Sequence, residues 1–85
     1  MSAPVVMYTT GWCPYCDRAR RLLASKGATI TDVDIESTPG KRDEMRTRSG
    51  RNTVPQIFIG ETYVGGCDEL HALDADGRLD ALLNG

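Results

Sequence analysis

The chain lacks the segments that would take it into or across a membrane. No apolar run among its 85 residues approaches the roughly 18 residues that a membrane span needs. The first four residues contain no basic segment followed by an apolar one, which a secretion signal would require. We therefore expect a cytoplasmic protein that makes no use of a membrane.

An excess of positive charge is also missing. Ten Lys and Arg residues face twelve Asp and Glu residues, so the formal net charge is -2. Proteins that neutralise many phosphates usually carry a clear basic excess, so nucleic acid is not expected as a partner. Nine of the ten basic residues nevertheless lie between Arg18 and Arg51, and six acidic residues lie from Glu61 onward. Solvated helix faces explain this distribution; the alternative is a positive field that attracts a small anion to an active site.

Cysteine and histidine are scarce. A disulfide-stapled secreted domain normally carries an even set of four or more cysteines, whereas this chain has three cysteines and one histidine. Cys13 and Cys16 form a C-x-x-C pair, which without a secretion signal indicates redox chemistry or a metal site. Zinc would need two more ligands, and the candidates are Cys67 and His71, whose four-residue spacing is weak evidence. We expect no metal and a solvent-facing His71.

The length and hydrophobic pattern of the chain predict one α/β domain over residues 1–85, because a chain of this length has room for one hydrophobic core. Hydrophobic periodicity and helix-start signals predict strands at residues 5–8, 29–35, 54–59 and 62–64, and helices that begin near residues 14, 39, 67 and 79. The order is therefore βαβαββαα. Because a β-α-β start requires parallel strands, this order predicts a four-stranded mixed sheet with helices on both faces.

Glycine and proline predict where the first two helices begin and end. Gly27 should end the first helix as a left-handed cap residue. For the second helix, Ser37-Thr38 supplies an N-cap candidate and Pro39 suits the first helical position. That helix should close at Gly50.

The start of the first helix determines the chemistry of the cysteine pair. If the first strand leads directly into this helix, Cys13 falls at its N-terminus and Pro14 in its first turn. The helix dipole and free backbone N–H groups then lower the pKa of Cys13 from about 8.5 into the range of roughly 3.5 to 7.5. Cys13 becomes the nucleophile. Cys16, three residues on and less exposed, lies close enough to form a disulfide and acts as the resolving thiol.

Several blocks of the sequence together resemble a known family. They are Tyr8-Thr9, the Cys-Pro-Tyr-Cys motif at 13–16, Thr-Val-Pro-Gln-Ile-Phe-Ile at 53–59 and Gly-Gly-Cys-Asp-Glu-Leu at 65–70. This arrangement resembles the dithiol glutaredoxins of the small bacterial type, and the likeness covers nearly the whole chain. The resemblance implies a thioredoxin-like fold, glutathione as co-substrate and no tightly bound cofactor.

The same resemblance implies a glutathione site. By its family pattern, Val54 pairs its backbone with glutathione and Pro55 follows a cis peptide bond, which is common only before proline. Gly66, Cys67 and Asp68 are assigned to the γ-glutamyl end, with the Asp68 carboxylate facing the ligand's ammonium group. Free N–H groups at a helix start do favour a carboxylate, so this assignment is physically reasonable.

Other positions complete the implied site. Thr53 belongs to the Thr-Val-Pro segment, and Tyr15 would line the cleft beside the sulfur. Thr10 stands where many family members have a lysine that helps bind the glycyl carboxylate. Arg51 is then the remaining candidate, because a guanidinium can bind a carboxylate through two hydrogen bonds. Trp12 either contacts protein substrates or packs over the neighbouring loop.

Structural explanations stay open for three of these residues. Tyr15 could simply belong to ordinary packing, and Asp68 could be a favourable charge at a helix N-terminus. Cys67 is most simply a buried structural residue, and the alternative is an auxiliary thiol that becomes oxidised or glutathionylated.

The resemblance implies an enzyme, expected as a monomer, that reduces protein–glutathione mixed disulfides and protein disulfides through Cys13 and Cys16. Ribonucleotide reductase is one expected client. A thioredoxin-like electron donor recharged by a flavoprotein reductase is one alternative. Another is an iron-sulfur carrier, in which two subunits share a cluster through Cys13, although Pro14 resembles the redox members more than the cluster-binding ones.

Overall fold

A computed structural model describes residues 3–84 of the chain. The elements are β1 (Val5–Thr9), α1 (Pro14–Ser25), β2 (Ile30–Asp34), α2 (Lys41–Ser49), β3 (Gln56–Ile59), β4 (Thr62–Gly65), α3 (Cys67–Ala75) and α4 (Arg78–Asn84). The predicted order βαβαββαα is confirmed. None of the helices within residues 3–84 has the length and apolar character needed to cross a membrane.

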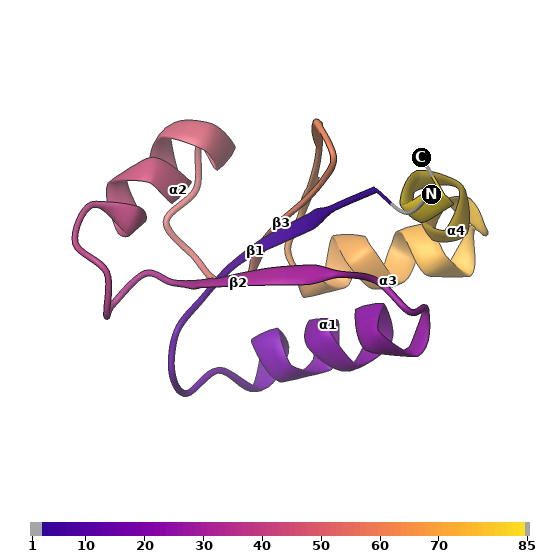
Figure 1. Cartoon of the computed structure of the whole chain (residues 1–85), viewed down its shortest axis with the longest axis horizontal. Coiled ribbons are helices and arrows are strands. Elements are labelled where there is room, and N and C mark those ends of the chain that lie inside the picture. Colours follow the sequence, from indigo (N-terminus) through magenta and orange to yellow (C-terminus); the bar gives the residue numbers. More distant parts are fainter. Residues whose placement is uncertain (1–2, 85) are drawn as a thin grey trace.

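The four strands form one mixed sheet in the order β2-β1-β3-β4. Strand β1 is parallel to β2 and antiparallel to β3, and β3 is antiparallel to β4. Helix α2 lies on one side of the sheet, whereas α1 and α3 lie on the other (Figure 1). Because β1 and β3 run in opposite directions, Tyr8 near the end of β1 pairs with Gln56 at the start of β3. The loop after β1 and the loop before β3 therefore meet at one edge of the sheet.

Each face of the sheet carries its own hydrophobic cluster. The larger cluster joins β1 and β3 to α1, α3 and α4, and its fully buried members include Val5, Met7, Leu23, Ile57, Leu70 and Leu79. The smaller cluster lies under α2 and consists of Tyr8, Ile35, Met45 and Phe58. Successive side chains of a strand point to opposite faces, so β1 contributes to both clusters, as its apolar sequence predicted.

Two predicted helix ends are confirmed. Gly27, one residue beyond the C-cap of α1, has a φ of 73°, and Gly50 at the C-cap of α2 has a φ of 72°. Both values are left-handed conformations that glycine adopts without the steric cost of a Cβ.

The predicted start of α2 at Pro39 is wrong, because the helix begins at Lys41. The chain turns first: the carboxylate of Asp34, the last residue of β2, accepts a hydrogen bond from the Glu36 N–H at 2.8 Å. Aspartate side chains stabilise turns in this way and so compete with an early helix start. The N-cap position is taken by Gly40 in a left-handed conformation with a φ of 84°.

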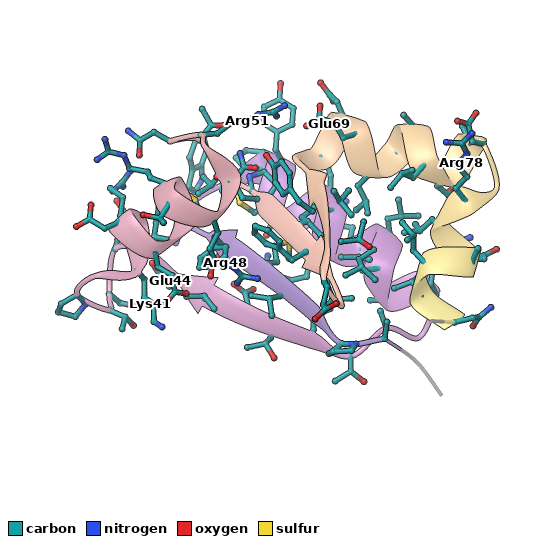
Figure 2. The ribbon with its side chains drawn as sticks, turned by 90° about the horizontal axis from the view of Figure 1, so that it is seen from above. Lys41, Glu44, Arg48, Arg51, Glu69 and Arg78 are labelled. Atoms are coloured by element: carbon teal, nitrogen blue, oxygen red, sulfur yellow. A yellow bond between two sulfur atoms is a disulfide. The ribbon has the colours of Figure 1, made fainter. Side chains whose placement is uncertain are left out.

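A polar cluster attaches α2 to the sheet, since Met45 is its one buried residue. The buried Tyr8 hydroxyl donates a hydrogen bond to Glu44 and accepts one from Arg48 at 2.8 Å. The Arg48 guanidinium lies 4.0 Å from the centre of the Phe58 ring, and Figure 2 shows Glu44 and Arg48 on the sheet-facing side of α2. Burial and the Glu44 contact raise the pKa of Tyr8, while the Tyr8 hydrogen bond lowers the pKa of Glu44.

We predict that Tyr8→Phe lowers the free energy of unfolding by about 1 to 2 kcal/mol, because two partly buried hydrogen bonds are lost while the ring is kept. Urea unfolding followed by circular dichroism measures this change. Tyr15→Phe is the matched control, since Tyr15 is 55% exposed, and it should shift stability by less than about 0.5 kcal/mol. Equal unfolding midpoints for the two variants would contradict the assignment.

Candidate active site

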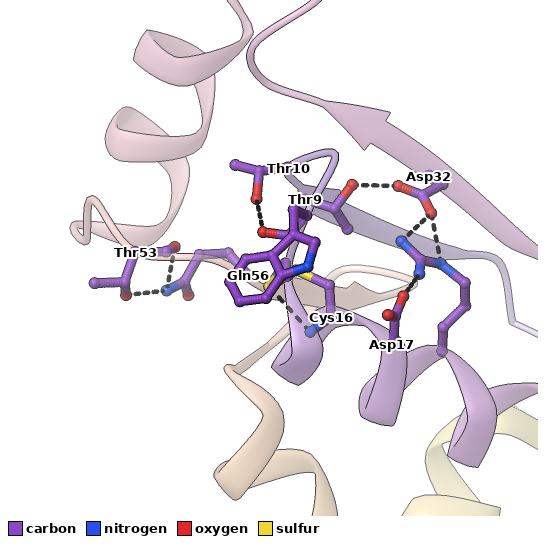
Figure 3. Close-up of a disulfide and its surroundings, with 10 residues drawn as sticks. Thr9, Thr10, Cys16, Asp17, Asp32, Thr53 and Gln56 are labelled. Carbon is purple, nitrogen blue, oxygen red and sulfur yellow. Dashed lines mark hydrogen bonds and ion pairs between the residues drawn. A yellow bond between two sulfur atoms is a disulfide. The ribbon is translucent and has the colours of Figure 1, made fainter.

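The cysteine pair lies where the first strand passes into the first helix. Cys13 is the N-cap residue of α1, with extended backbone at a φ of -155°, and Pro14 occupies the first helical position. Cys13 and Cys16 are joined by a disulfide, and their Cα atoms are 5.1 Å apart (Figure 3). The predicted placement of the pair at a helix start is confirmed.

The Cys13 sulfur takes the place that a side-chain oxygen occupies in an ordinary N-cap. The Cys16 N–H donates to the Cys13 Sγ at 3.1 Å. N–H groups in the first turn have no intrahelical acceptor, so they are free to stabilise negative charge on this sulfur. Cys13 is 9% exposed and Cys16 is 1% exposed. Cys13 is therefore the more exposed residue of the pair.

A polar network that the sequence analysis did not predict lies beside the disulfide. The buried Thr9 hydroxyl at the end of β1 donates to Asp32 on β2, with an O–O distance of 2.5 Å. Arg20 on α1 bridges the carboxylates of Asp32 and Asp17 (Figure 3). Half-exposed ion pairs of this kind add little stability. Their effect is to connect the end of β1 and the middle of α1 to β2.

A cleft of about 200 Å³ begins at the first turn of α1. Three segments that are far apart in the sequence line it: the start of α1, the loop before β3 and the start of α3. The lining contains all eight residues predicted for the glutathione site, together with two others; they are Tyr15, Arg51, Thr53, Val54, Pro55, Gln56, Gly66, Cys67, Asp68 and Glu69. Fold topology thus collects residues from both halves of the chain around one opening.

The loop before β3 has the backbone form that the family resemblance implied. The Val54–Pro55 peptide bond is cis, and β3 begins at the next residue. A Cβ placed on Gly66 would lie 3.4 Å from the Pro55 carbonyl oxygen. This is an ordinary van der Waals distance, so the start of α3 lies close to the loop without requiring glycine at position 66.

Exposure decides between the alternatives left open for the aromatic residues. Tyr15 is 55% exposed and lines the cleft, so ordinary packing does not explain it. Trp12 is 86% exposed, so it does not pack over the neighbouring loop. Large exposed aromatic side chains next to a reactive group are typical of contact surfaces.

Cys67 and His71 lie on one side of α3, four residues apart. Cys67 is buried, and burial raises the pKa of its thiol, which disfavours the reactive thiolate and supports a packing role. The expectation that His71 faces solvent is wrong: it is half-buried, and its Nε2 has no hydrogen-bond partner among residues 3–84. The reason is its position one turn after Cys67 on the helix face that packs inward.

Gln56 is a cleft residue that the sequence analysis did not assign. It is 1% exposed, and its amide group donates to the Thr53 backbone oxygen at 3.0 Å and to the Thr53 hydroxyl at 3.1 Å. Its Oε1 accepts from the Tyr63 hydroxyl at 2.6 Å. A glutamine inside an otherwise apolar block was the available signal, because buried amides need hydrogen-bond partners.

Glu69 is the second unassigned cleft residue. Its Oε1 accepts from the Gly66 N–H at 2.7 Å and from Arg51 Nη1 at 2.9 Å. These two contacts, the backbone one first, lower the pKa of the Glu69 carboxyl. The contact with Gly66 is one half of a capping box, and an acid three residues after the N-cap was the signal for it. No group of three or more His, Cys, Asp or Glu residues within 3–84 is arranged to hold a metal ion.

We predict that the Cys13 thiol ionises well below the value of about 8.5 for a free cysteine, because N–H groups of the first turn of α1 point at its sulfur. The measurement is the pH dependence of alkylation by iodoacetamide in the Cys16→Ser variant, which keeps the residue 16 backbone N–H. Cys67, buried and with a raised pKa, should react slowly in the same protein. A Cys13 midpoint near 8.5 would show that the helix start does not activate this sulfur.

Comparison with known proteins agrees with this geometry. The protein-family model named Glutaredoxin matches residues 5–64. The glutaredoxin of Pseudomonas aeruginosa is 56% identical over 81 residues, which cover 95% of this chain and 96% of that protein. The solution structure of Brucella melitensis glutaredoxin superposes with a TM-score of 0.83 at 56% identity, covering 96% of this chain and 89% of the other. The crystal structure of a buckwheat glutaredoxin–glutathione complex superposes with a TM-score of 0.88 at 29% identity, covering 96% and 77%.

The family match extends over most of the chain, and the Cys-Pro-Tyr-Cys motif lies at a helix start within it. The fold order, the cysteine pair and the similarity to proteins of known family point to the same conclusion. The chain belongs to the glutaredoxin family and is a thiol-disulfide oxidoreductase of the dithiol type with a thioredoxin-like fold.

Proposed function

We propose that this protein uses glutathione to reduce protein–glutathione mixed disulfides and protein disulfides, with Cys13 as nucleophile and Cys16 as resolving thiol. The main supporting observation is the cleft that leads away from the first turn of α1 and contains every residue predicted for a glutathione site. The buckwheat relative was solved as a complex with glutathione, which supports the same ligand here.

The cleft offers complementary groups along the length of glutathione. The backbone of Val54 precedes β3 and pairs with the extended ligand as an added strand would. Arg51 binds the glycyl carboxylate, since it is the cationic residue in the lining. At the other end, N–H groups at the start of α3 bind the γ-glutamyl carboxylate, and Asp68 faces the ammonium group.

In the proposed reaction with a glutathionylated protein, the Cys13 thiolate attacks the glutathione sulfur. A disulfide forms between Cys13 and glutathione as the original disulfide breaks, and the protein thiolate leaves and takes up a proton. The thiolate of a second glutathione then attacks the glutathione sulfur held on Cys13. Oxidised glutathione leaves, and Cys13 returns to the thiolate form.

In the proposed reaction with a protein disulfide, Cys13 attacks one client sulfur and forms a mixed disulfide with the protein. The Cys16 thiolate then attacks the Cys13 sulfur, releasing the reduced client and leaving the Cys13–Cys16 disulfide, which two glutathione molecules reduce. The 5.1 Å separation of the two Cα atoms is within the range for a disulfide. Trp12, exposed beside Cys13, supplies contact area for such clients.

Turnover with different reductants tests this function. We expect rapid reduction of a glutathionylated peptide when glutathione, glutathione reductase and NADPH are supplied, because the cleft fits glutathione. Thioredoxin reductase with NADPH, at the same protein concentration, is expected to give no more than background turnover. Turnover supported by thioredoxin reductase but not by glutathione would show that the protein is a thioredoxin-like donor instead.

Single cysteine variants separate the two routes. Cys16→Ser should retain reduction of the glutathionylated peptide and lose reduction of a protein disulfide such as that of insulin, because only the second route needs a resolving thiol. Cys13→Ser should lose both activities, because both routes begin with attack by this thiolate. Removal of glutathione from the peptide by the Cys13→Ser variant would refute the mechanism.

A further inference from the structure

The Glu69 side chain is paired with Arg51, the cation that the proposed ligand would need. One carboxylate oxygen, Oε1, accepts from the Gly66 N–H at 2.7 Å and from Arg51 Nη1 at 2.9 Å. Arg51 follows α2 and Glu69 belongs to the first turn of α3, and Figure 2 shows the two residues along the same edge of the molecule. Both residues line the cleft.

The Glu69 carboxylate fits into space that the absence of a side chain at Gly65 leaves open. Gly65 has a φ of 111°, and a Cβ at that residue would lie 2.5 Å from Glu69 Oε1. Glycine therefore leaves the space in which the carboxylate sits, between one backbone N–H and one guanidinium group. These are the kinds of donor that bind a carboxylate in a ligand.

The charges that line the cleft determine how the Arg51–Glu69 ion pair affects the binding of an anionic ligand. Among the lining residues, Arg51 is the single cation, whereas Asp68 and Glu69 are carboxylates. Glutathione brings two carboxylates of its own. A ligand carboxylate that approaches Arg51 meets a guanidinium already paired with Glu69.

We propose that Glu69 is an internal competitor for Arg51, which glutathione must displace from the guanidinium when it binds. This inference rests on the proposed function and adds a residue that sets the affinity for glutathione. Glu69 keeps its hydrogen bond to the Gly66 N–H in both states, so α3 stays capped while Arg51 is released. Selectivity follows, because a thiol ligand without a carboxylate at this position gains nothing that would displace Glu69.

The expected effect is modest. The Arg51 and Glu69 side chains are 51% and 43% exposed, and exposed ion pairs are weak because water screens them. The competition can therefore change ligand affinity by about two- to five-fold. A contact of this strength opens readily, so it lowers affinity without blocking the site.

Glu69→Gln tests the proposal. Glutamine keeps an acceptor for the Gly66 N–H at this capping position but removes the charge that pairs with Arg51. With glutathione, glutathione reductase and NADPH, KM for a glutathionylated peptide should fall about two- to five-fold while kcat stays within error. Glu61→Gln removes the same charge in the turn between β3 and β4, outside the cleft, and should leave KM unchanged.

A double variant shows whether the effect acts through Arg51. Arg51→Ala alone should raise KM several-fold, and Glu69→Gln added to it should produce no further fall beyond that of the Glu61→Gln control. An unchanged or raised KM in Glu69→Gln would overturn the proposal, because it would mean that Glu69 only holds Arg51 in place. If the unsubstituted protein shows no glutathione-dependent turnover, the proposed function itself fails, so the two failures are distinguishable.

Discussion

The start of helix α1 beneath the Cys13 sulfur is the constraint on which the chemistry of this protein depends. The sulfur accepts a hydrogen bond from the Cys16 N–H at 3.1 Å. Pro14 suits the first helical position because it has no backbone N–H, and an N–H at that position would have no intrahelical acceptor. The predicted activation of Cys13 therefore comes from the backbone at the start of α1. Such activation survives changes in the surrounding surface as long as β1 delivers the chain to this helix start.

The pairing of the strands places other segments of the chain next to the cysteine pair and so forms the cleft. The antiparallel pairing of β1 with β3 sets Tyr8 opposite Gln56, so the loop that ends in Pro55 lies next to the loop that carries Cys13. Helix α3 begins close to Pro55, because a Cβ on Gly66 would lie 3.4 Å from the Pro55 carbonyl oxygen. The cleft thus forms between two helix N-termini and one strand start, where free N–H groups favour a ligand with negative charge.

The charges that dominate the middle of the sequence are mostly used for structure. Arg20 pairs with Asp17 within α1, and Lys26 at the C-cap of α1 pairs with Asp74 on α3. Lys41 and Arg46 form ion pairs within α2, and Arg51 is the basic residue that lines the cleft. The interpretation as solvated helix faces therefore explains the basic segment better than a general positive field does. Arg51 is the exception, and its guanidinium is shared with Glu69.

The sequence by itself determined what depends on neighbours along the chain: the order of the elements, the helix ends at Gly27 and Gly50, the hairpin and the cysteine pair at a helix start. Motif resemblance added the cleft residues, because each block carries its own local geometry. Only the tertiary structure decided the features that depend on contacts between segments far apart in the sequence. The Arg51–Glu69 contact and the half-buried His71 follow from how helices pack on the sheet, and the local pattern does not specify that packing.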